Sequence, residues 1–118
     1  INPDRAALYA RIEARFDQMI AGGALEEARA LAQRQLDASL PAMKAVGLPP
    51  LLAYRAGEIG LETAIETAKR DSRRYAKRQV TWFSNQHPGW AGIASLDPGR
   101  QRGELDRLLA QAFPERFP

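Results

Sequence analysis

The stretch from about Gly60 to Asn85 limits what this chain can fold into more than any other part of the sequence. It contains neither proline nor glycine after its first residue. Its apolar side chains return every three or four positions, which is the period of an amphipathic α-helix. These positions are Leu61, Ala64, Ile65, Ala68, Tyr75, Ala76, Val80 and Phe83, and His87-Pro88-Gly89 supplies the stop signal. The sequence therefore predicts one long helix.

The rest of the chain reads mostly as shorter helices joined by turns. Asn2-Pro3-Asp4 predicts a helix start, with Asn as the N-cap and Pro at the first helical position, and Gly22-Gly23 predicts its end. Further helices are expected over 25–36, 51–56 and 103–113, a helical turn at Pro41, a bend over 44–50 and a short strand over 93–96. The 118 residues suffice for one modest core. We predict an all-α fold, with a single compact helical domain over residues 1–118 built around one long basic helix.

Composition excludes several kinds of site. There is no cysteine, so neither a disulfide framework nor a thiolate metal site is possible, and a single histidine argues against zinc. No apolar run is long enough for a membrane span, and the start does not resemble a signal peptide, so we expect a cytoplasmic protein with no membrane partner. The chain begins with Ile1 instead of Met. We therefore interpret it as a piece of a longer protein.

No complete catalytic motif is visible. The sequence lacks the phosphate-binding pattern GxxxxGK[ST], the metalloprotease pattern HExxH, the nucleophile pattern GxSxG and any histidine paired with a nucleophile. Most acidic residues sit near Arg or Lys at helical spacing, where ion pairing explains them. From the residues alone, the chain is not a whole enzyme.

Positive charge is concentrated on the long helix. Six of the seventeen basic residues lie between Lys69 and Arg78, with Asp71 as the one acidic residue among them. Like charges four residues apart, such as Arg74 and Arg78, cost a few tenths of a kcal/mol each, so a ligand that neutralises them is favoured. Tyr75 lies among these cations and could stack on bases. The segment predicts an anion-binding helix, suited to nucleic acid, a diphosphate or an acidic surface.

Other interpretations of the same residues, most of which need no nucleic acid or other ligand, stay open at this point. A charge run is commonly a solvated helix face, or it pairs with an acidic protein partner. Trp82 lies one position off the apolar stripe, so it can be half core and half surface. His87 fits a cap or surface residue better than a ligand. Arg15, four residues after Arg11, fits a salt bridge to Glu13 or Asp17 by spacing alone.

Three segments, in this order, resemble the C-terminal region of tRNA dimethylallyltransferases, the isopentenyl transferases that modify an adenosine beside the anticodon. RIEARFDQMIAGGALEEARAL, residues 11–31, resembles the family's Arg-x-x-x-Arg-Phe-x-x-Met helix and the helix after it. KAVG, residues 44–47, resembles the family's bend. GEIGLETAIETAKRDSRRYAKRQVTWF, residues 57–83, resembles the segment ending in Arg-x-x-Ala-Lys-Arg-Gln-x-Thr-Trp. That last motif is specific, and the resemblance extends from about Arg11 to Phe83.

The resemblance implies an activity and its partners. Members transfer a dimethylallyl group from dimethylallyl diphosphate to N6 of adenosine 37 of tRNA, with Mg²⁺. Their N-terminal half has a P-loop-kinase-like α/β fold that binds the diphosphate and Mg²⁺ and supplies the catalytic aspartate, and we expect it upstream of Ile1. The target base is flipped into a channel between the two parts. This chain would then be the C-terminal part that holds the tRNA anticodon stem-loop, inactive alone and expected to be monomeric.

The resemblance also implies roles for individual residues. Arg15 matches an arginine that lines the channel near the reacting groups, so it is the candidate for a supporting catalytic role. No residue of this chain is assigned to the metal. The residues matched to tRNA contacts are Lys44, Ala45, Val46, Gly47, Leu48 and Pro49 of the bend, and Arg73, Lys77, Arg78, Gln79 and Trp82 of the long helix. Glycine at position 47 would let the backbone approach RNA closely.

One departure from the family pattern matters. Many members have Tyr-Arg after the Val-Gly of the bend, whereas this chain has Leu48-Pro49. A Gly-x-Pro bend is reminiscent of the adenylate isopentenyltransferases, which act on free nucleotides, while the intact KRQVTW favours tRNA. Two further alternatives are a free-standing helical RNA-binding module without catalysis and a helical interaction domain for an acidic protein.

Overall fold

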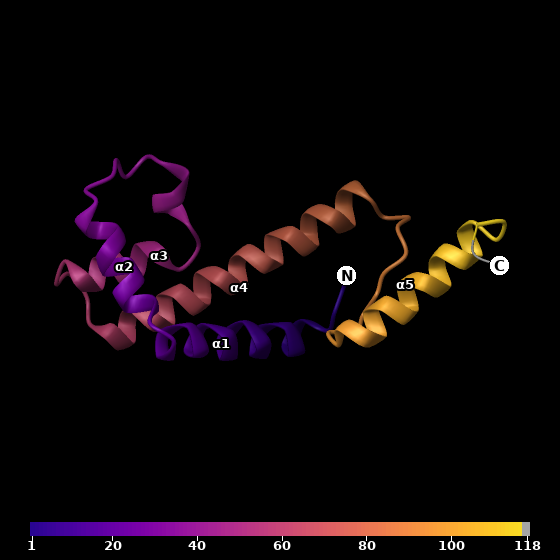
Figure 1. The fold of residues 1–118 in the computed structure, drawn as a ribbon, viewed down its shortest axis with the longest axis horizontal. Coiled ribbons are helices and arrows are strands. Elements are labelled where there is room, and N and C mark those ends of the chain that lie inside the picture. Colours follow the sequence, from indigo (N-terminus) through magenta and orange to yellow (C-terminus); the bar gives the residue numbers. More distant parts are fainter. Residues whose placement is uncertain (117–118) are drawn as a thin grey trace. The chain divides into compact units, whose positions relative to one another are not determined.

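The computed structural model describes residues 1–116, and every regular element in that range is helical. The elements are α1 (Arg5–Ala21), α2 (Ala24–Gln33), the 3₁₀ helix η1 (Pro41–Lys44), α3 (Leu48–Arg55), α4 (Leu61–Gln86) and α5 (Pro98–Ala112) (Figure 1). The predicted all-α class is confirmed, and so is the long helix, whose bounds in the structure differ from the predicted ones by one residue at each end.

By its internal contacts the chain divides into two compact units. One consists of Tyr9–Gln79 and contains most of α1, all of α2, η1 and α3, and α4 as far as Gln79. The other consists of Ile1–Leu8 together with the chain from Val80 onward, and contains α5. Each unit is described by itself below. The single domain over residues 1–118 stays a prediction.

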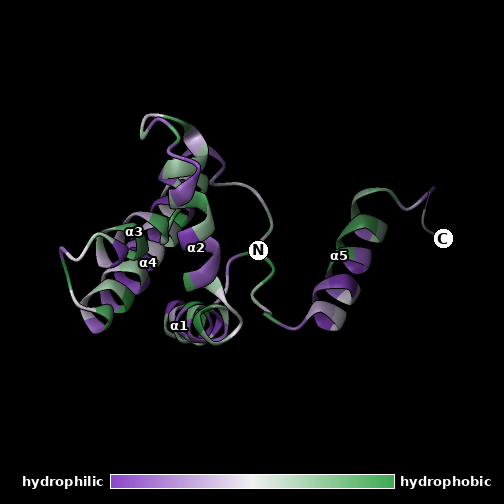
Figure 2. Ribbon diagram, turned by 60° about the vertical axis from the view of Figure 1, so that its left-hand side comes forward, coloured by the Kyte–Doolittle hydropathy of each residue, from purple (hydrophilic) through white to green (hydrophobic). Residues whose placement is uncertain are grey.

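The hydrophobic core lies in the unit formed by Tyr9–Gln79. Its buried residues are Phe16 of α1, Ala28 of α2, Leu51 of α3, and Ala64 and Ala68 of α4. Ala64 and Ala68 are one helical turn apart, so they present a smooth face on which the larger Phe16 and Leu51 pack. In Figure 2 hydrophobic and hydrophilic residues follow one another along the helices, as expected of helices that bury only part of their surface.

Two ion pairs attach α1 to α4 within this unit. Lys69 Nζ lies 2.7 Å from Asp17 Oδ1, and the guanidinium of Arg73 donates to the carboxylate of Glu13. Two of the cations of α4, Lys69 and Arg73, are therefore paired with carboxylates of α1. Ser72, which interrupts the apolar stripe, donates a hydrogen bond from its hydroxyl to Ala68 O at 2.8 Å. Its polar group therefore has a partner within its own helix.

The predicted start of the first helix is wrong. The helix begins at Arg5, and Asp4 caps it: its side chain accepts a hydrogen bond from Ala7 N at 3.0 Å. The backbone N–H of Asn2, the residue predicted as the cap, donates instead to Ile93 O at 2.7 Å. The helix is therefore capped locally, but by Asp4, two residues after the predicted Asn2.

The predicted bend over 44–50 is too long. α3 begins at Leu48, so Pro49 and Pro50 occupy its first turn, where the missing N–H groups cost nothing. Proline marks a helix start here, not a continued turn. The turn at Pro41 is confirmed as η1, and α2 ends three residues before the predicted Leu36.

The short strand predicted over 93–96 is wrong, because residues 1–116 contain no strand. The one backbone bond to Asn2 does not make a ladder, and a strand without a paired neighbour has no stability of its own. The last helix begins earlier than predicted, at Pro98. Asp97 caps it by accepting from Arg100 N at 2.8 Å, and proline again occupies the first turn.

Candidate functional site

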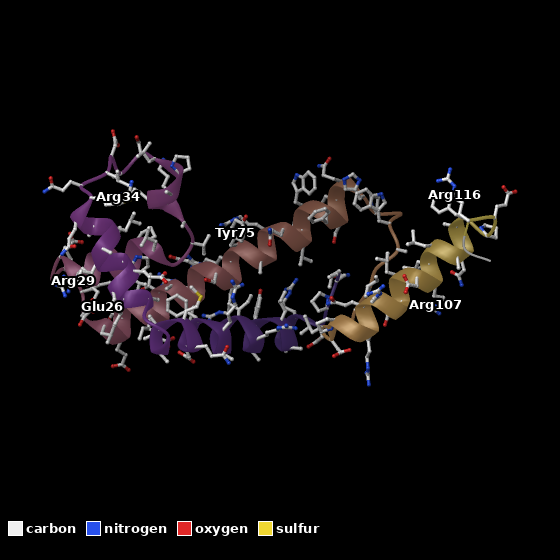
Figure 3. All side chains as sticks on the ribbon, viewed as in Figure 1. Glu26, Arg29, Arg34, Tyr75, Arg107 and Arg116 are labelled. Atoms are coloured by element: carbon white, nitrogen blue, oxygen red, sulfur yellow. The ribbon has the colours of Figure 1, made fainter. Side chains whose placement is uncertain are left out.

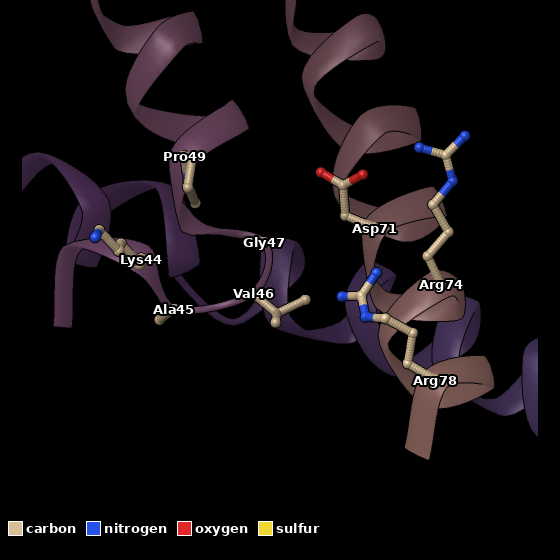
Figure 4. A pocket seen from close by; sticks show the side chains of 8 residues that line it. All are labelled: Lys44, Ala45, Val46, Gly47, Pro49, Asp71, Arg74 and Arg78. Atoms are coloured by element: carbon tan, nitrogen blue, oxygen red, sulfur yellow. The ribbon is translucent and has the colours of Figure 1, made fainter. Parts of the chain in front are cut away.

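A cavity of about 270 Å³ lies between the bend at 44–49 and the outer face of α4. Figure 4 shows the two sides, with the bend on one and three charged side chains of α4 on the other. The lining residues are Lys44, Ala45, Val46, Gly47, Pro49, Asp71, Arg74 and Arg78, all within the unit formed by Tyr9–Gln79. We call this cavity the bend–α4 cleft.

Gly47 fixes the bend against the core. Its φ of +91° lies in the left-handed region, which favours glycine. A Cβ built on it would come within 3.1 Å of Phe16 Cε2 and 3.9 Å of Ala68 Cβ. The position therefore requires glycine for packing as well as for conformation. Leu48, the next residue, packs against the core and does not line the cleft.

The α4 side of the cleft follows helical spacing. Asp71, Arg74 and Arg78 are separated by three and four residues, so they share one face. In Figure 4 the guanidinium of Arg78 extends toward Val46, whereas the ammonium of Lys44 points away from α4. The Arg78 guanidinium carbon lies 5.8 Å from the ring centroid of Tyr75 (labelled in Figure 3), a cation–π contact that restricts this side chain.

The charge of the cleft suits an anion. Its lining carries Lys44, Arg74 and Arg78 against the single carboxylate of Asp71, which itself has Arg70 Nε at 3.9 Å. Guanidinium groups present paired donors that match phosphate oxygens. The same lining does not fit Mg²⁺, which prefers several oxygen ligands and is repelled by cations. Within residues 1–116 no group of three or more His, Cys, Asp and Glu side chains is placed to hold a metal ion.

The cleft gathers about half of the residues that the sequence nominated. Lys44, Ala45, Val46, Gly47, Pro49 and Arg78 line it. Arg73 faces α1 and its partner Glu13, while Lys77 and Gln79 are exposed on α4 outside the lining. Arg15 is exposed on α1 and also lies outside the lining. Trp82 belongs to the other unit and is 54% exposed, with its ring 4.9 Å from that of Phe83.

Two lining residues, Asp71 and Arg74, are absent from the nominated set. Arg74 carried a signal, because it precedes Arg78 by one helical turn. Nothing in the sequence pointed to Asp71 as a site residue except its place among the basic residues of the helix. Both become site residues through the position of the bend, a contact between distant parts of the sequence.

None of the helices within residues 1–116 combines the length and the apolar character needed to cross a bilayer.

Comparison with known proteins places the chain in a family. The model of the family described as IPP transferase matches residues 1–86. A tRNA dimethylallyltransferase from Maricaulis maris is 58% identical over 111 residues, which are 94% of this chain and 36% of that protein. One from Nitrobacter hamburgensis is 63% identical over 86 residues, 73% of this chain and 27% of that protein. The chain thus spans about a third of the length of these relatives.

Two solved structures with related names also match this chain. The full-length tRNA isopentenylpyrophosphate transferase from Bacillus halodurans matches with a TM-score of 0.80 and 37% identity, over 95% of this chain and 37% of that chain. A tRNA isopentenylpyrophosphate transferase from Staphylococcus epidermidis matches with a TM-score of 0.75 and 33% identity, over 94% and 36%. The family match covers well over half of the sequence, includes the bend and reaches the end of α4. The chain therefore belongs to the IPP transferase family.

Proposed function

We propose that this chain is the tRNA-contacting part of a transferase that moves a dimethylallyl group from dimethylallyl diphosphate to N6 of adenosine 37 of tRNA. The observation that carries the proposal is the bend–α4 cleft. Two arginines one turn apart line it together with a glycine-containing bend, in a chain of the IPP transferase family. The names of the relatives, tRNA dimethylallyltransferase and tRNA isopentenylpyrophosphate transferase, support tRNA as the substrate.

In this proposal the cleft takes the RNA backbone. Arg74 and Arg78 would bind phosphate oxygens of the anticodon stem-loop, and Asp71 would fix the orientation of the neighbouring guanidinium groups. Lys77 and Gln79 would contact RNA from the exposed part of α4. Arg73, held by Glu13, would contribute less to RNA because its charge already has a partner.

The chemical step would draw on residues outside this chain. Dimethylallyl diphosphate and Mg²⁺ would be bound there, since the described residues offer no suitable group for the metal. Arg15, exposed on α1, would support the reaction by facing the channel that receives the flipped adenosine. Action on tRNA in the cytoplasm as a monomer, with no membrane partner, completes the proposal.

A domain exchange tests the proposal. The matching third of the Maricaulis maris relative is replaced by this chain, and transfer of labelled dimethylallyl groups from the diphosphate to tRNA is measured. At 58% identity the exchanged part should fit its new neighbour. We expect transfer by the chimera, and a loss of at least about tenfold when Arg15→Ala is introduced. Arg34→Ala, at the C-terminal end of α2, serves as the matched control.

A folded chimera that transfers no dimethylallyl group, beside an active parent enzyme, would contradict the proposal. Unchanged activity of the Arg15→Ala chimera would show that Arg15 does not support the reaction. The proposed tRNA-binding role of the chain would then be tested by binding measurements alone.

A further inference from the structure

Four aromatic rings gather where α4 ends, all within the unit formed by Ile1–Leu8 and the chain from Val80. They belong to Trp82, Phe83, His87 and Trp90, and we call them the aromatic cluster. The ring centroids of His87 and Trp90 lie 3.8 Å apart, with 9° between the ring planes, so the two rings stack face to face. Trp82 meets Phe83 edge-on, with centroids 4.9 Å apart.

Backbone hydrogen bonds hold the stacked pair in place. The His87 N–H donates to Phe83 O at 2.9 Å, which extends the helical hydrogen bonding by one residue. The Trp90 N–H donates to His87 O at 3.2 Å and closes a turn. The main chain is thus ordered at both residues, and the rings that extend from it stack on each other without a ligand. Such preorganisation lowers the entropy cost of binding.

The aromatic cluster is exposed. Trp82, Phe83 and Trp90 are 54%, 50% and 67% exposed, and none of them belongs to the hydrophobic core. Aromatic side chains gathered in this way on a surface mark an interaction site. If these rings only stabilised the end of α4, burying them against the rest of the chain would stabilise the fold more than leaving them exposed.

The surrounding sequence indicates what the aromatic cluster binds. No Asp, Glu, Lys or Arg occurs from Thr81 to Leu96, whereas the exposed residues Ser84, Asn85 and Gln86, between Phe83 and His87 in the sequence, carry hydroxyl and amide groups. Phosphates and acidic peptides require cations, and this stretch of sequence contributes none. Unpaired nucleobases require flat aromatic faces and hydrogen-bonding groups that reach base edges. The chemistry therefore matches bases and not the backbone that carries them.

We propose that the aromatic cluster is a stacking platform for unpaired nucleobases of RNA, with Trp90 as its main surface. The inference rests on the proposed function in one respect, because RNA is the ligand in both. It goes beyond it by adding a base-binding surface to the phosphate-binding cleft and by using residues after position 86, where the family match ends.

Tryptophan fluorescence gives a direct readout, because both tryptophans of the chain belong to the aromatic cluster. The 118-residue chain is titrated with a single-stranded adenosine hexamer and, as a control, with an abasic phosphodiester of the same length. Fluorescence anisotropy of the labelled oligonucleotides measures binding separately. Stacking predicts quenching by the hexamer and none by the abasic chain at equal occupancy.

Variants distinguish stacking from general apolar contact. We expect Trp90→Ala and Trp90→Leu each to weaken hexamer binding at least about fivefold, and Trp90→Phe to retain most of it, because only a ring can stack. The helix content, followed by circular dichroism, should not change, since Trp90 is largely exposed.

Two results would overturn the inference. If the hexamer binds, as anisotropy reports, without quenching, or if Trp90→Leu binds as well as the unaltered chain, bases do not stack on the aromatic cluster, and the proposed function stands. If fluorescence changes with protein concentration alone, the aromatic cluster is a contact between protein copies. Failure of every oligonucleotide to bind, with the stem-loop included, would overturn this inference and the proposed function together.

Discussion

Lys69 Nζ and Asp17 Oδ1 lie 2.7 Å apart and join the long basic helix to α1. The side chain of Lys69 is only 12% exposed, whereas that of Asp17 is 59% exposed. This contact and the neighbouring pair Arg73–Glu13 set the rotation of α4 and leave Arg74 and Arg78 on the face that lines the bend–α4 cleft. The ion pairs on one side of the helix therefore help determine which cations are available on the other.

Removing the acceptor should destabilise the fold modestly. We expect Asp17→Asn to lower the free energy of unfolding by about 0.5–1 kcal/mol, because Lys69 loses its partner while the exposure of Asp17 allows water to compensate in part. Urea unfolding measures the change. Asp106→Asn, an exposed aspartate on α5, is the control and should leave the unfolding midpoint unchanged.

The same pair makes stability depend on pH at the alkaline end. The hydrogen bond to Asp17 raises the pKa of Lys69 above its ordinary value of 10.5. A raised pKa means that the stabilisation is complete below about pH 10.5 and is lost as the pH rises through the folded-state pKa. Urea midpoints at increasing pH should therefore fall less for Asp17→Asn than for the unaltered chain. Equal decline of both would show that the pair contributes nothing.

Gly47 should tolerate no side chain. We expect Gly47→Ala to destabilise the chain by about 2–4 kcal/mol, from a strained positive φ and from the contact of the new Cβ with Phe16. Gly57→Ala is the matched control: its φ is +77°, yet nothing lies within 4 Å of the added Cβ, so it should cost only about 1–2 kcal/mol. Equal losses in the two variants would mean that packing on Phe16 does not matter.

The basic residues of α4 should separate into two kinds. Arg73→Ala should lower stability, with a coupling to Glu13 of about 0.5–1 kcal/mol in a double-mutant cycle with Glu13→Gln. Lys77→Ala, at an exposed position, should leave stability unchanged and weaken RNA binding. Thermal unfolding and RNA titration of the same proteins compare the two. A cycle with no coupling would show that Arg73 is held by other contacts.

Local periodicity was sufficient to predict the helices, whereas the errors concern their ends and the segments between them. The apolar spacing of α4 predicted its bounds to within one residue, because nothing inside it interrupts the helix. The Asn2 cap was wrong because Asp4, two residues later, caps the helix by accepting from Ala7 N, and both residue types are good caps. The strand at 93–96 was wrong because no partner strand exists in residues 1–116, and a missing partner cannot be read from a short window of sequence.

The candidate site was half predictable for the same reason. The bend and Arg78 could be nominated from a motif. Asp71 and Arg74 join them only because Gly47 packs on Phe16 and brings the bend opposite α4. The motif also nominated Arg73 together with Arg78 for tRNA contacts, whereas the ion pair of Arg73 with Glu13 directs it to α1.

The most direct test of the bend–α4 cleft is binding of the chain to an anticodon stem-loop with adenosine 37 in its loop, beside an RNA duplex, from about 50 to 200 mM salt. We predict preference for the stem-loop. Arg74→Ala and Arg78→Ala should each weaken its binding and lower the salt dependence by about one phosphate contact, while Arg34→Ala, outside the cleft, should not. Equal binding of both RNAs, with all three variants alike, would contradict the account.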